Sequence, residues 1–296
     1  MRVFVTGASG FVGSAVVAEL LAAGHQVLGL ARSESAAAAV AAAGADVHRG
    51  GLEDLEGLRS AAASADGVIH TAFIHEFSDY ARSASVDQQA ITALGETLAG
   101  SGRPLVVTPG MATLTPGRAA TEDDAPNARI PRVSEQTAAQ FAERGVRVSV
   151  MRLPPSVHGQ GDHGFVPRLI EIARERGVSG YVGEGANAWA AVHRLDAARL
   201  FRLALEGAPA GARLHAVGDE GVPARDIAEL IGRWLKVPAV SVPAEQAGEH
   251  FGWLGSFFSM DVQASSALTA QRYNWRPTQP GLLADLDHAY YFGGER

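Results

Sequence analysis

The sequence contains no cysteine among its 296 residues. Disulfide bonds, thiolate nucleophiles and cysteine-ligated metals are therefore excluded. No segment approaches the ~18 consecutive apolar residues that a membrane-spanning helix needs, and the N-terminus begins an apolar strand without the features of a secretory signal. The formal net charge is -7 and there is no basic run, so the chain lacks the charge pattern of proteins that bind nucleic acid or anionic membranes. These absences predict a cytoplasmic protein that binds neither nucleic acid nor membrane.

The apolar content of the chain is sufficient for a large core. Hydrophobic residues make up 47% of the 296 residues, and at this size one core begins to divide into two lobes. In the first half, short apolar runs without polar alternation are separated by helical patterns. This pattern predicts a doubly wound parallel α/β sheet of the Rossmann type, covered by helices on both faces. The expected strands span residues 3–6, 26–31, 45–48, 67–71, 105–108 and 147–153, and the expected helices span residues 10–23, 53–63, 86–100 and 131–144.

The alternation loosens in the second half of the chain. Helices are expected at residues 165–176 and 196–206, a strand at 213–217 and a short strand near Val240. The sequence shows no internal repeat, linker or low-complexity tail. We therefore predict a sheet domain of residues 1–155, to which residues 188–218 return. A smaller lobe comprises residues 156–187 and 219–296.

A glycine-rich turn follows the first expected strand. Gly7 and Gly10 allow the backbone to approach a pyrophosphate, and Gly13 allows the next helix to pack closely on the strand. The free N–H groups at the start of that helix attract anionic oxygens. Glycine triplets also occur in ordinary tight turns, but the position between a strand and a helix favours a dinucleotide site. The predicted contacts are Gly7, Ser9, Gly10, Phe11, Val12 and Gly13.

The end of the second expected strand indicates which dinucleotide binds. Enzymes that prefer NAD usually carry an acidic residue there for the ribose hydroxyls, whereas this strand runs into Arg32 and Ser33. A guanidinium and a hydroxyl suit a 2′-phosphate. The pair predicts NADP(H) as the cofactor. The alternative is a solvated arginine in a turn.

Motifs along nearly the whole chain resemble those of one enzyme superfamily. They are TGASGFVG at residues 6–13, the pair Arg32 and Ser33, HTAF at 70–73, MRLPPSVHGQGD at 151–162, VHRLDAARL at 192–200 and YNWRPTQPGL at 273–282. They resemble the extended or atypical short-chain dehydrogenase/reductases, which include nucleotide-sugar epimerases and dihydroflavonol-type reductases. The resemblance implies a small-molecule substrate bound by the smaller lobe. It also implies a homodimer formed through helices beside the fourth and fifth strands.

The same resemblance implies further cofactor contacts. Residues 71 and 72 would flank the ribose, and residues 154–157 would lie beside the nicotinamide. Gly51 stands where such proteins commonly carry an aspartate that touches adenine, which leaves Leu52 as the adenine contact. The implied contacts beyond the glycine turn are Leu52, Thr71, Ala72, Thr108, Pro154, Pro155, Ser156 and Val157.

The residues that usually carry the reaction in this superfamily are missing. In such reductases a tyrosine protonates the carbonyl oxygen, a lysine four residues later lowers its pKa, and a serine orients the substrate. The matching positions are Pro131, Glu135 and Gly110. Because Lys236 is the only lysine and Gly232 stands four residues before it, no tyrosine–lysine pair of that spacing exists. As a plain helix start, Pro131 suits the first turn and Glu135 suits the macrodipole.

An enzyme of this kind would need another proton donor. His158 follows the segment implied to lie beside the nicotinamide, and an unperturbed imidazole pKa of about 6.5 suits proton delivery at neutral pH. A histidine in a polar turn is often only a hydrogen-bond anchor. The resemblance implies that Tyr80 and His75 lie in a loop that borders the substrate, and that Ser134 lies on a helical face turned toward the nicotinamide. The predicted catalytic residues are therefore His158, Ser134 and Tyr80.

The sequence predicts no metal site. His158, Asp162 and His163 are close in sequence but lack a further ligand at a defined helical spacing. Asp196 is interpreted as the N-cap of the helix that follows it. No Gly-x-Ser-x-Gly elbow is present, which removes the commonest hydrolase signal for an α/β chain.

Aromatic residues dominate the predicted substrate contacts, which are Phe73, His75, Met111, Tyr181 and Trp189, with Phe77 as a further aromatic residue. Relatives that act on nucleotide sugars carry an arginine where this chain has Trp189. An indole offers apolar surface and one N–H donor instead of a charge for phosphate. A core tryptophan between the lobes is the alternative interpretation. The set favours a small or medium apolar ligand.

Two classes of function remain open at this stage. The first is an NADPH-dependent reductase of a carbonyl or imine substrate that uses a non-standard proton donor. The second is a catalytically degenerate protein that binds NADP(H) and senses its redox state. The second lobe with its aromatic residues favours the enzyme.

Overall fold

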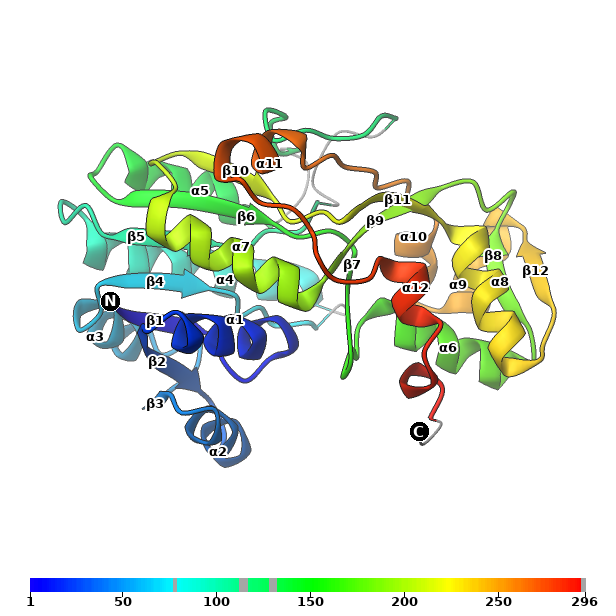
Figure 1. Cartoon of the computed structure of the whole chain (residues 1–296), viewed down its shortest axis with the longest axis horizontal. Coiled ribbons are helices and arrows are strands. Elements are labelled where there is room, and N and C mark those ends of the chain that lie inside the picture. Colours follow the sequence, from blue (N-terminus) through cyan, green and yellow to red (C-terminus); the bar gives the residue numbers. More distant parts are fainter. Residues whose placement is uncertain (77–78, 112–116, 128–131, 294–296) are drawn as a thin grey trace.

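The computed structural model describes residues 1–76, 79–111, 117–127 and 132–293. The described residues form two lobes that lie side by side (Figure 1). The larger lobe contains the N-terminus and a seven-stranded sheet, and the smaller lobe contains two short sheets. No helix in the described part of the chain is long and apolar enough to cross a bilayer.

The seven-stranded sheet is parallel throughout and has the strand order β10-β6-β5-β4-β1-β2-β3. Its central strands are runs of apolar residues with both faces covered, as parallel sheets require. Phe4 and Ile69 are fully buried on neighbouring strands. The strands are β1 (Arg2–Thr6), β2 (Gln26–Ala31), β3 (Asp46–Arg49), β4 (Gly67–His70), β5 (Pro104–Val107), β6 (Arg147–Arg152) and β10 (Ala212–His215).

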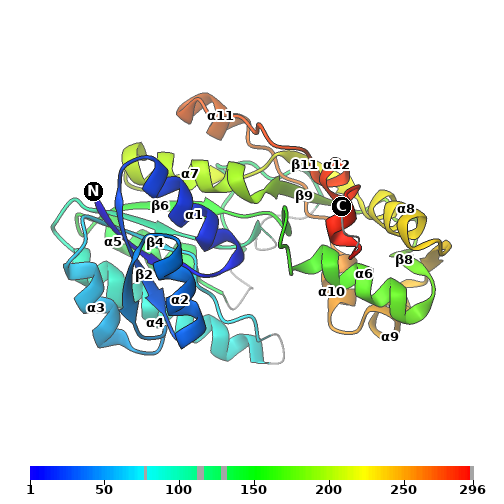
Figure 2. The same cartoon turned by 60° about the horizontal axis from the view of Figure 1, so that its bottom comes forward.

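Helices cover both faces of this sheet, which confirms the predicted doubly wound fold (Figure 2). One face packs against α1 (Phe11–Ala22) and α7 (Arg194–Gly207), which also contact each other. The other face packs against α3 (Leu55–Ala63), α4 (Tyr80–Leu98) and α5 (Ser134–Ala142). Helix α2 (Glu34–Ala42) lies against β2 and β3.

The smaller lobe has its own hydrophobic core. Strand β9 pairs with β7 and β11 there and not with the seven-stranded sheet, whereas α7 and β10 from the same segment lie on that sheet. The strands are β7 (Ser156–His158), β8 (Ser179–Val182), β9 (Ala188–His193), β11 (Asp219–Pro223) and β12 (Ala239–Val242). The C-terminal half also contains α6 (Phe165–Arg176), α8 (Ala224–Leu235), η3 (Ala244–Gln246), α9 (Ala247–Phe251), α10 (Leu254–Phe258), α11 (Ala267–Tyr273), α12 (Leu282–Leu286) and η4 (Ala289–Tyr291).

Several helix starts differ from the sequence-based prediction; the helix expected from residue 131, for example, begins at Ser134. Helix α4 begins at Tyr80, because the Asp79 side chain accepts a hydrogen bond from the Arg82 N–H and caps it. Tyr80 is therefore the first residue of a helix and not part of a loop. The interpretation of Asp196 as an N-cap is also wrong, since His193 caps α7 by accepting from the N–H of residue 195.

Asp196 has a different structural task. Its buried carboxylate accepts hydrogen bonds from the backbone N–H groups of Thr278 and Gln279, each at 2.9 Å. The indole of Trp275, also buried, donates to the Asp196 carbonyl at 3.1 Å. Asp196 therefore anchors the C-terminal segment to α7, where it crosses from one lobe to the other (Figure 1).

Candidate active site

The glycine turn between β1 and α1 leaves no room for side chains. Gly7 has φ of 71°, a conformation that a Cβ disfavours, and a Cβ there would lie 2.7 Å from the Thr71 Oγ1. A Cβ on Gly13 would lie 2.0 Å from the Gly7 carbonyl oxygen. Gly10, the N-cap of α1, offers no side-chain hydrogen bond to the helix N–H groups. This turn fits a dinucleotide pyrophosphate, which the backbone of residues 9–12 would hold.

The arginine after β2 is the predicted contact for the adenosine end of such a cofactor. Arg32 is exposed and takes part in none of the ion pairs between described residues. The neighbouring acidic residue Glu34 is bound to Arg49, with 2.7 Å between Oε2 and Nη2. The Ser33 hydroxyl already accepts from the Ala36 N–H and caps α2. Arg32 therefore carries the available positive charge. Leu52, the predicted adenine contact, is partly buried beside α3.

Threonine hydroxyls form hydrogen bonds between the carboxyl ends of the central strands. Thr71 Oγ1 donates to the Thr6 carbonyl at 2.7 Å, and the Ala72 N–H donates to Thr6 Oγ1 at 3.3 Å. Thr108 Oγ1 donates to the His70 carbonyl at 2.8 Å. These contacts hold the segments after β1, β4 and β5 together at the sheet edge where α/β proteins bind ligands.

The Arg132 guanidinium lies at this edge of the sheet, and Arg132 follows the position that the resemblance matches to the tyrosine. Arg132 donates from Nη2 to the Thr108 carbonyl at 2.7 Å and from Nε to the Ser134 hydroxyl at 3.0 Å. Its Cζ lies 3.9 Å from the ring centroid of Phe73, which stacks on the cation. Nη1 has no hydrogen bond within the described part of the chain. The sequence analysis did not identify Arg132, although it stands next to Pro131.

A buried chain of polar groups fixes Ser134. The Ser134 hydroxyl donates a short hydrogen bond to Asp87, whose other carboxylate oxygen lies 3.3 Å from His70 Nε2. His70 Nδ1 lies 2.8 Å from Thr6 Oγ1. Burial of Asp87 opposes its ionisation, but the His70 hydrogen bond and the Arg132 charge hold its pKa below the usual range. Asp87 is therefore a carboxylate that fixes Ser134 and also pairs directly with Arg132, whose Nε lies 3.5 Å from Asp87 Oδ2.

Aromatic residues surround the guanidinium. Phe73 lies 5.4 Å from the His75 ring and 5.9 Å from the Tyr80 ring, measured between centroids. Burial raises the pKa of Tyr80, although the Arg132 charge opposes this shift. Tyr80 is therefore a neutral phenol at neutral pH. Of the predicted residues, Ser134, Tyr80, Phe73 and His75 are brought together around Arg132.

Comparison with known proteins places the chain in a family. The model of the "NAD dependent epimerase/dehydratase family" matches residues 3–100. An uncharacterized protein of Schizosaccharomyces pombe is 52% identical over 295 residues, which cover 99% of this chain and 100% of that protein. A 2-alkyl-3-oxoalkanoate reductase of Stenotrophomonas maltophilia is 30% identical over 229 residues, which cover 72% of this chain and 67% of the reductase. The chain belongs to the NAD-dependent epimerase/dehydratase family.

The solved structures agree with this assignment at the level of the fold. A dTDP-glucose 4,6-dehydratase from Streptomyces venezuelae, crystallised with NAD, superimposes with a TM-score of 0.79 at 20% identity. The match covers 99% of this chain and 97% of the dehydratase. This likeness at 20% identity shows a shared fold. The family match and the reductase relative identify the chain as an enzyme of the NAD(P)-dependent oxidoreductase class, as its motifs predicted.

The positions of the missing catalytic residues are only partly described. Pro131, at the tyrosine position, lies outside the described residues. Glu135, at the lysine position, is buried and paired with Arg152. Gly110 bridges to Leu153, so that the segments after β5 and β6 run side by side. No side chain at these described positions replaces the usual relay.

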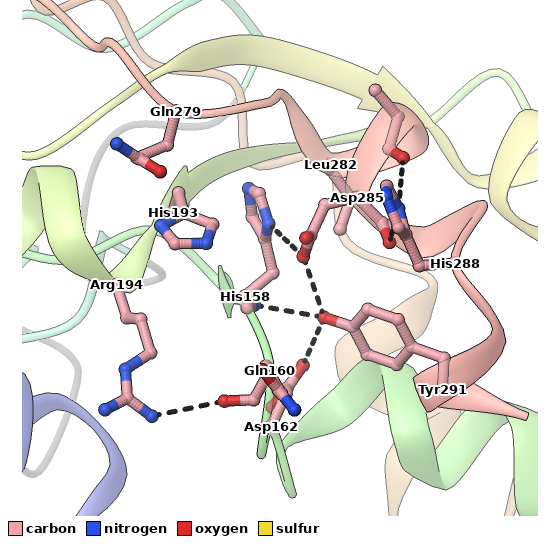
Figure 3. Close-up of polar contacts among 12 residues, drawn as sticks. His158, Gln160, Asp162, His193, Arg194, Gln279, Leu282, Asp285, His288 and Tyr291 are labelled. Atoms are coloured by element: carbon pink, nitrogen blue, oxygen red, sulfur yellow. Dashed lines mark hydrogen bonds and ion pairs between the residues drawn. The ribbon is translucent and has the colours of Figure 1, made fainter. Parts of the chain in front are cut away.

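His158 lies in a separate cluster between β7 and the C-terminal segment (Figure 3). It is fully buried, and its Nδ1 lies 2.9 Å from Asp285 Oδ2. The Tyr291 hydroxyl lies 3.3 Å from the same oxygen and 3.4 Å from Asp162, and it accepts from the Gly159 N–H. His158 Nε2 has no partner among the described residues. This geometry favours the interpretation of His158 as an anchor between segments.

The surroundings of this cluster raise the pKa of two of its groups and lower that of a third. Burial raises the pKa of Asp162 to about 6, although the Gly164 N–H and the His158 charge oppose the shift. Burial also raises the pKa of Tyr291. Burial alone would raise the pKa of Asp285, but the hydrogen bonds from His158 and Tyr290 together outweigh this effect and lower it. Asp285 is thus the carboxylate of the cluster, and Asp162 gains a proton readily.

The other predicted substrate residues pack with the smaller lobe. Trp189 has 1% exposure and packs against Phe165 and Phe258 in the small-lobe core, which favours the core interpretation. Met111 is buried in the same core, at 2% exposure. Tyr181 is on β8 beneath Arg225, whose Cζ lies 5.0 Å from the ring centroid. Phe77 lies outside the described residues.

The segment that the resemblance implies to lie beside the nicotinamide follows β6 and runs into β7. Pro154 and Pro155 lie between β6 and β7, and Ser156 and Val157 are the first residues of β7. Met111 donates its N–H to the Leu153 carbonyl at 2.9 Å. The buried Ser156 hydroxyl has no hydrogen-bond partner among the described residues. No group of three or more potential metal ligands occurs within the described ranges.

Proposed function

We propose that this protein is an NADPH-dependent reductase of small or medium apolar carbonyl or imine substrates, in which Arg132 replaces the tyrosine–lysine pair. One observation carries the proposal. A guanidinium is fixed at the carboxyl ends of β4 and β5 by Thr108, Ser134 and Phe73, next to the position of the missing tyrosine. The sheet edge at which it lies is the ligand-binding edge of this fold.

The cofactor assignment rests on Arg32 and the glycine turn. The turn would hold the pyrophosphate, and the unpaired Arg32 would contact the 2′-phosphate that distinguishes NADP from NAD. NADPH supplies a hydride when bound. The chain itself must supply the binding of the acceptor, its orientation and a proton.

Arg132 would bind the acceptor through its carbonyl oxygen. A carbonyl gains negative charge on its oxygen as it is reduced, and a fixed guanidinium donor stabilises that charge. Ser134, held by Asp87, and the Thr108 carbonyl orient Arg132 before the substrate arrives. Because this scaffold is preformed, little reorganisation is needed during the reaction. An iminium substrate already carries its activating charge and would depend less on Arg132.

Tyr80 is the proton donor that the geometry favours. Its ring packs against Phe73 in the same cluster as Arg132, and its pKa is raised, so the phenol retains its proton at neutral pH. In the reduction the phenol gives its proton to the substrate oxygen and regains one from water. His158 is disfavoured because it is fully buried against Asp285 in the other cluster.

The named relative supports a ketone substrate. The relative from Stenotrophomonas maltophilia is a 2-alkyl-3-oxoalkanoate reductase. The aromatic residues Phe73 and Tyr80 around Arg132 suit an apolar chain next to the reacting carbonyl. We therefore expect medium-length 3-oxo compounds to be better substrates than nucleotide sugars.

The test is NADPH oxidation by the purified protein against 3-oxo acids and esters, simple ketones, aldehydes and cyclic imines. Turnover of at least one class above the rate without protein supports the proposal. Tight binding of NADPH with no turnover in any class would favour the redox-sensor alternative. A faster reaction with NADH than with NADPH would contradict the assignment of Arg32.

A further inference from the structure

Arg194 connects the two lobes at the start of the cofactor-binding helix. It is the first residue of α7, and its Cζ lies 4.7 Å from the ring centroid of Phe11. Nη2 donates to the Ser14 hydroxyl at 3.3 Å, on the second turn of α1. Nη1 donates to the Gln160 carbonyl at 3.2 Å, in the loop between β7 and α6 (Figure 3).

The charge of Arg194 is not balanced by the protein. No carboxylate in the described part of the chain forms an ion pair with it, although it is partly buried. Burial alone lowers its pKa, without an opposing contribution from an acidic neighbour. The other arginines of α7 differ: Arg199 pairs with Asp196, and Arg202 pairs with Glu19 and Glu206.

The position of Arg194 adds to this imbalance. Phe11 is the first residue of α1, and the start of a helix carries a partial positive charge. A cation held there is unfavourable in the free protein. Local conflicts of this kind are typical of binding sites, where a ligand removes them. Here the ligand must be an anion, because both the helix start and the guanidinium attract negative charge.

We propose that Arg194 binds the diphosphate of the dinucleotide cofactor from the side opposite the glycine turn. The inference rests on the cofactor site of the proposed function, but not on the substrate or the chemistry. Arg32 and Arg194 then have separate tasks. Arg32 contacts the phosphate that only NADP carries, whereas Arg194 contacts the diphosphate that NAD and NADP share.

The contact would also transmit cofactor binding to the second lobe. The same guanidinium holds the Gln160 carbonyl, and His163 of that loop packs edge-on against Phe11 with 5.8 Å between ring centroids. The loop leads directly into α6. A diphosphate bound at Arg194 would therefore contact the same guanidinium that holds the loop between β7 and α6 against α1.

The experiment is a calorimetric titration of the full chain with NADP⁺, NAD⁺ and 2′-AMP, which has the 2′-phosphate but no diphosphate. Arg194→Gln is expected to weaken NADP⁺ and NAD⁺ binding by a similar factor, roughly tenfold or more, and to leave 2′-AMP unchanged. Arg32→Ala should weaken NADP⁺ and 2′-AMP but not NAD⁺. Arg194→Lys should retain part of the affinity.

The matched control is Arg202→Gln, which removes the same charge from the same helix and should leave binding of all three ligands unchanged. The thermal midpoint of each variant shows that it is folded. Binding of NADP⁺ and NAD⁺ to Arg194→Gln at the wild-type affinity would overturn the inference alone. An equal loss for 2′-AMP would also overturn it, by indicating a general field effect. If the wild-type protein bound neither dinucleotide, the inference and the proposed function would both fall.

Discussion

The carboxylate of Glu135 binds the fully buried guanidinium of Arg152 through two contacts, Oε1 to Nη2 at 2.8 Å and Oε2 to Nε at 3.0 Å. Arg213 adds a third contact to Glu135, at 2.6 Å. Glu135 is the residue that the resemblance matches to the lysine of such reductases. In this structure it holds α5 against β6.

Glu135→Ala is expected to destabilise the protein by about 3–5 kcal/mol, because it leaves the buried Arg152 without its counter-charge. Chemical denaturation followed by circular dichroism measures the change. Glu34→Ala removes an exposed ion pair with Arg49 and should cost less than about 1 kcal/mol. Equal effects of the two substitutions would contradict the structural role of Glu135.

Arg132→Gln should lower kcat/KM by roughly 100- to 1,000-fold, the usual effect of losing one donor to a developing oxyanion. Arg132→Lys should recover part of the activity, because it keeps the charge but loses the planar contacts to Thr108 and Ser134. Steady-state kinetics with the best ketone measure both variants. NADP⁺ affinity is the control, and a variant with unchanged kcat/KM would remove Arg132 from the mechanism.

Tyr80→Phe should lower kcat by roughly 100-fold while leaving KM nearly unchanged, because only the proton donor is lost. His158→Ala serves as the comparison: it should lower stability, through the loss of the Asp285 contact, more than it lowers kcat per folded molecule. The opposite ranking of the two variants in kcat would return the role of the acid to His158.

Gly13→Ala should abolish dinucleotide binding or destabilise the protein by several kcal/mol, since its Cβ would lie 2.0 Å from the Gly7 carbonyl oxygen. Gly207→Ala is the matched control, also on a helix, where a Cβ meets nothing within 4 Å. Calorimetric binding and the thermal midpoint should separate the two. Wild-type binding by the Gly13 variant would mean that α1 can move away from the strand.

Asp162→Asn should stabilise the protein at about pH 7.5 by about 1–2 kcal/mol and have little effect at about pH 4. The folded protein raises the pKa of Asp162 to about 6, so its ionisation opposes folding. This penalty is absent below the unfolded value near 3.8 and grows as the pH rises through 6. Urea midpoints at the two pH values measure it, and a loss of stability at about pH 7.5 would contradict the assignment.

The sheet domain was predictable because its signals are local. Each central strand is an unbroken apolar run, and the glycine turn lies between a strand and a helix, so the position of Gly7 and Gly13 followed from the chain alone. The start of α4 was missed, since the cap at Asp79 is a single side-chain contact. Strand β9 was not recognised because its partners β7 and β11 come from distant parts of the sequence.

The candidate site was harder to predict. Asp87 belongs to no motif, and it meets His70 only when α4 packs beside β4. Arg132 is held at the site by contacts with Thr108 and Phe73, which are 24 and 59 positions away in the sequence. Trp189 was singled out by its aromatic side chain, which is equally common in ligand sites and in hydrophobic cores. Only its burial in the structure distinguishes the core residue from the substrate contact.

Helix α8 ends at Leu235, and its C-cap is Lys236, which is exposed and adopts a left-handed backbone conformation with φ of 57°. Lys236 carries the single lysine ε-amine of the chain, on the smaller lobe. A lysine-reactive dye would therefore label this lobe at one defined position. A change in the fluorescence of that dye would report whether the smaller lobe responds when a dinucleotide is added.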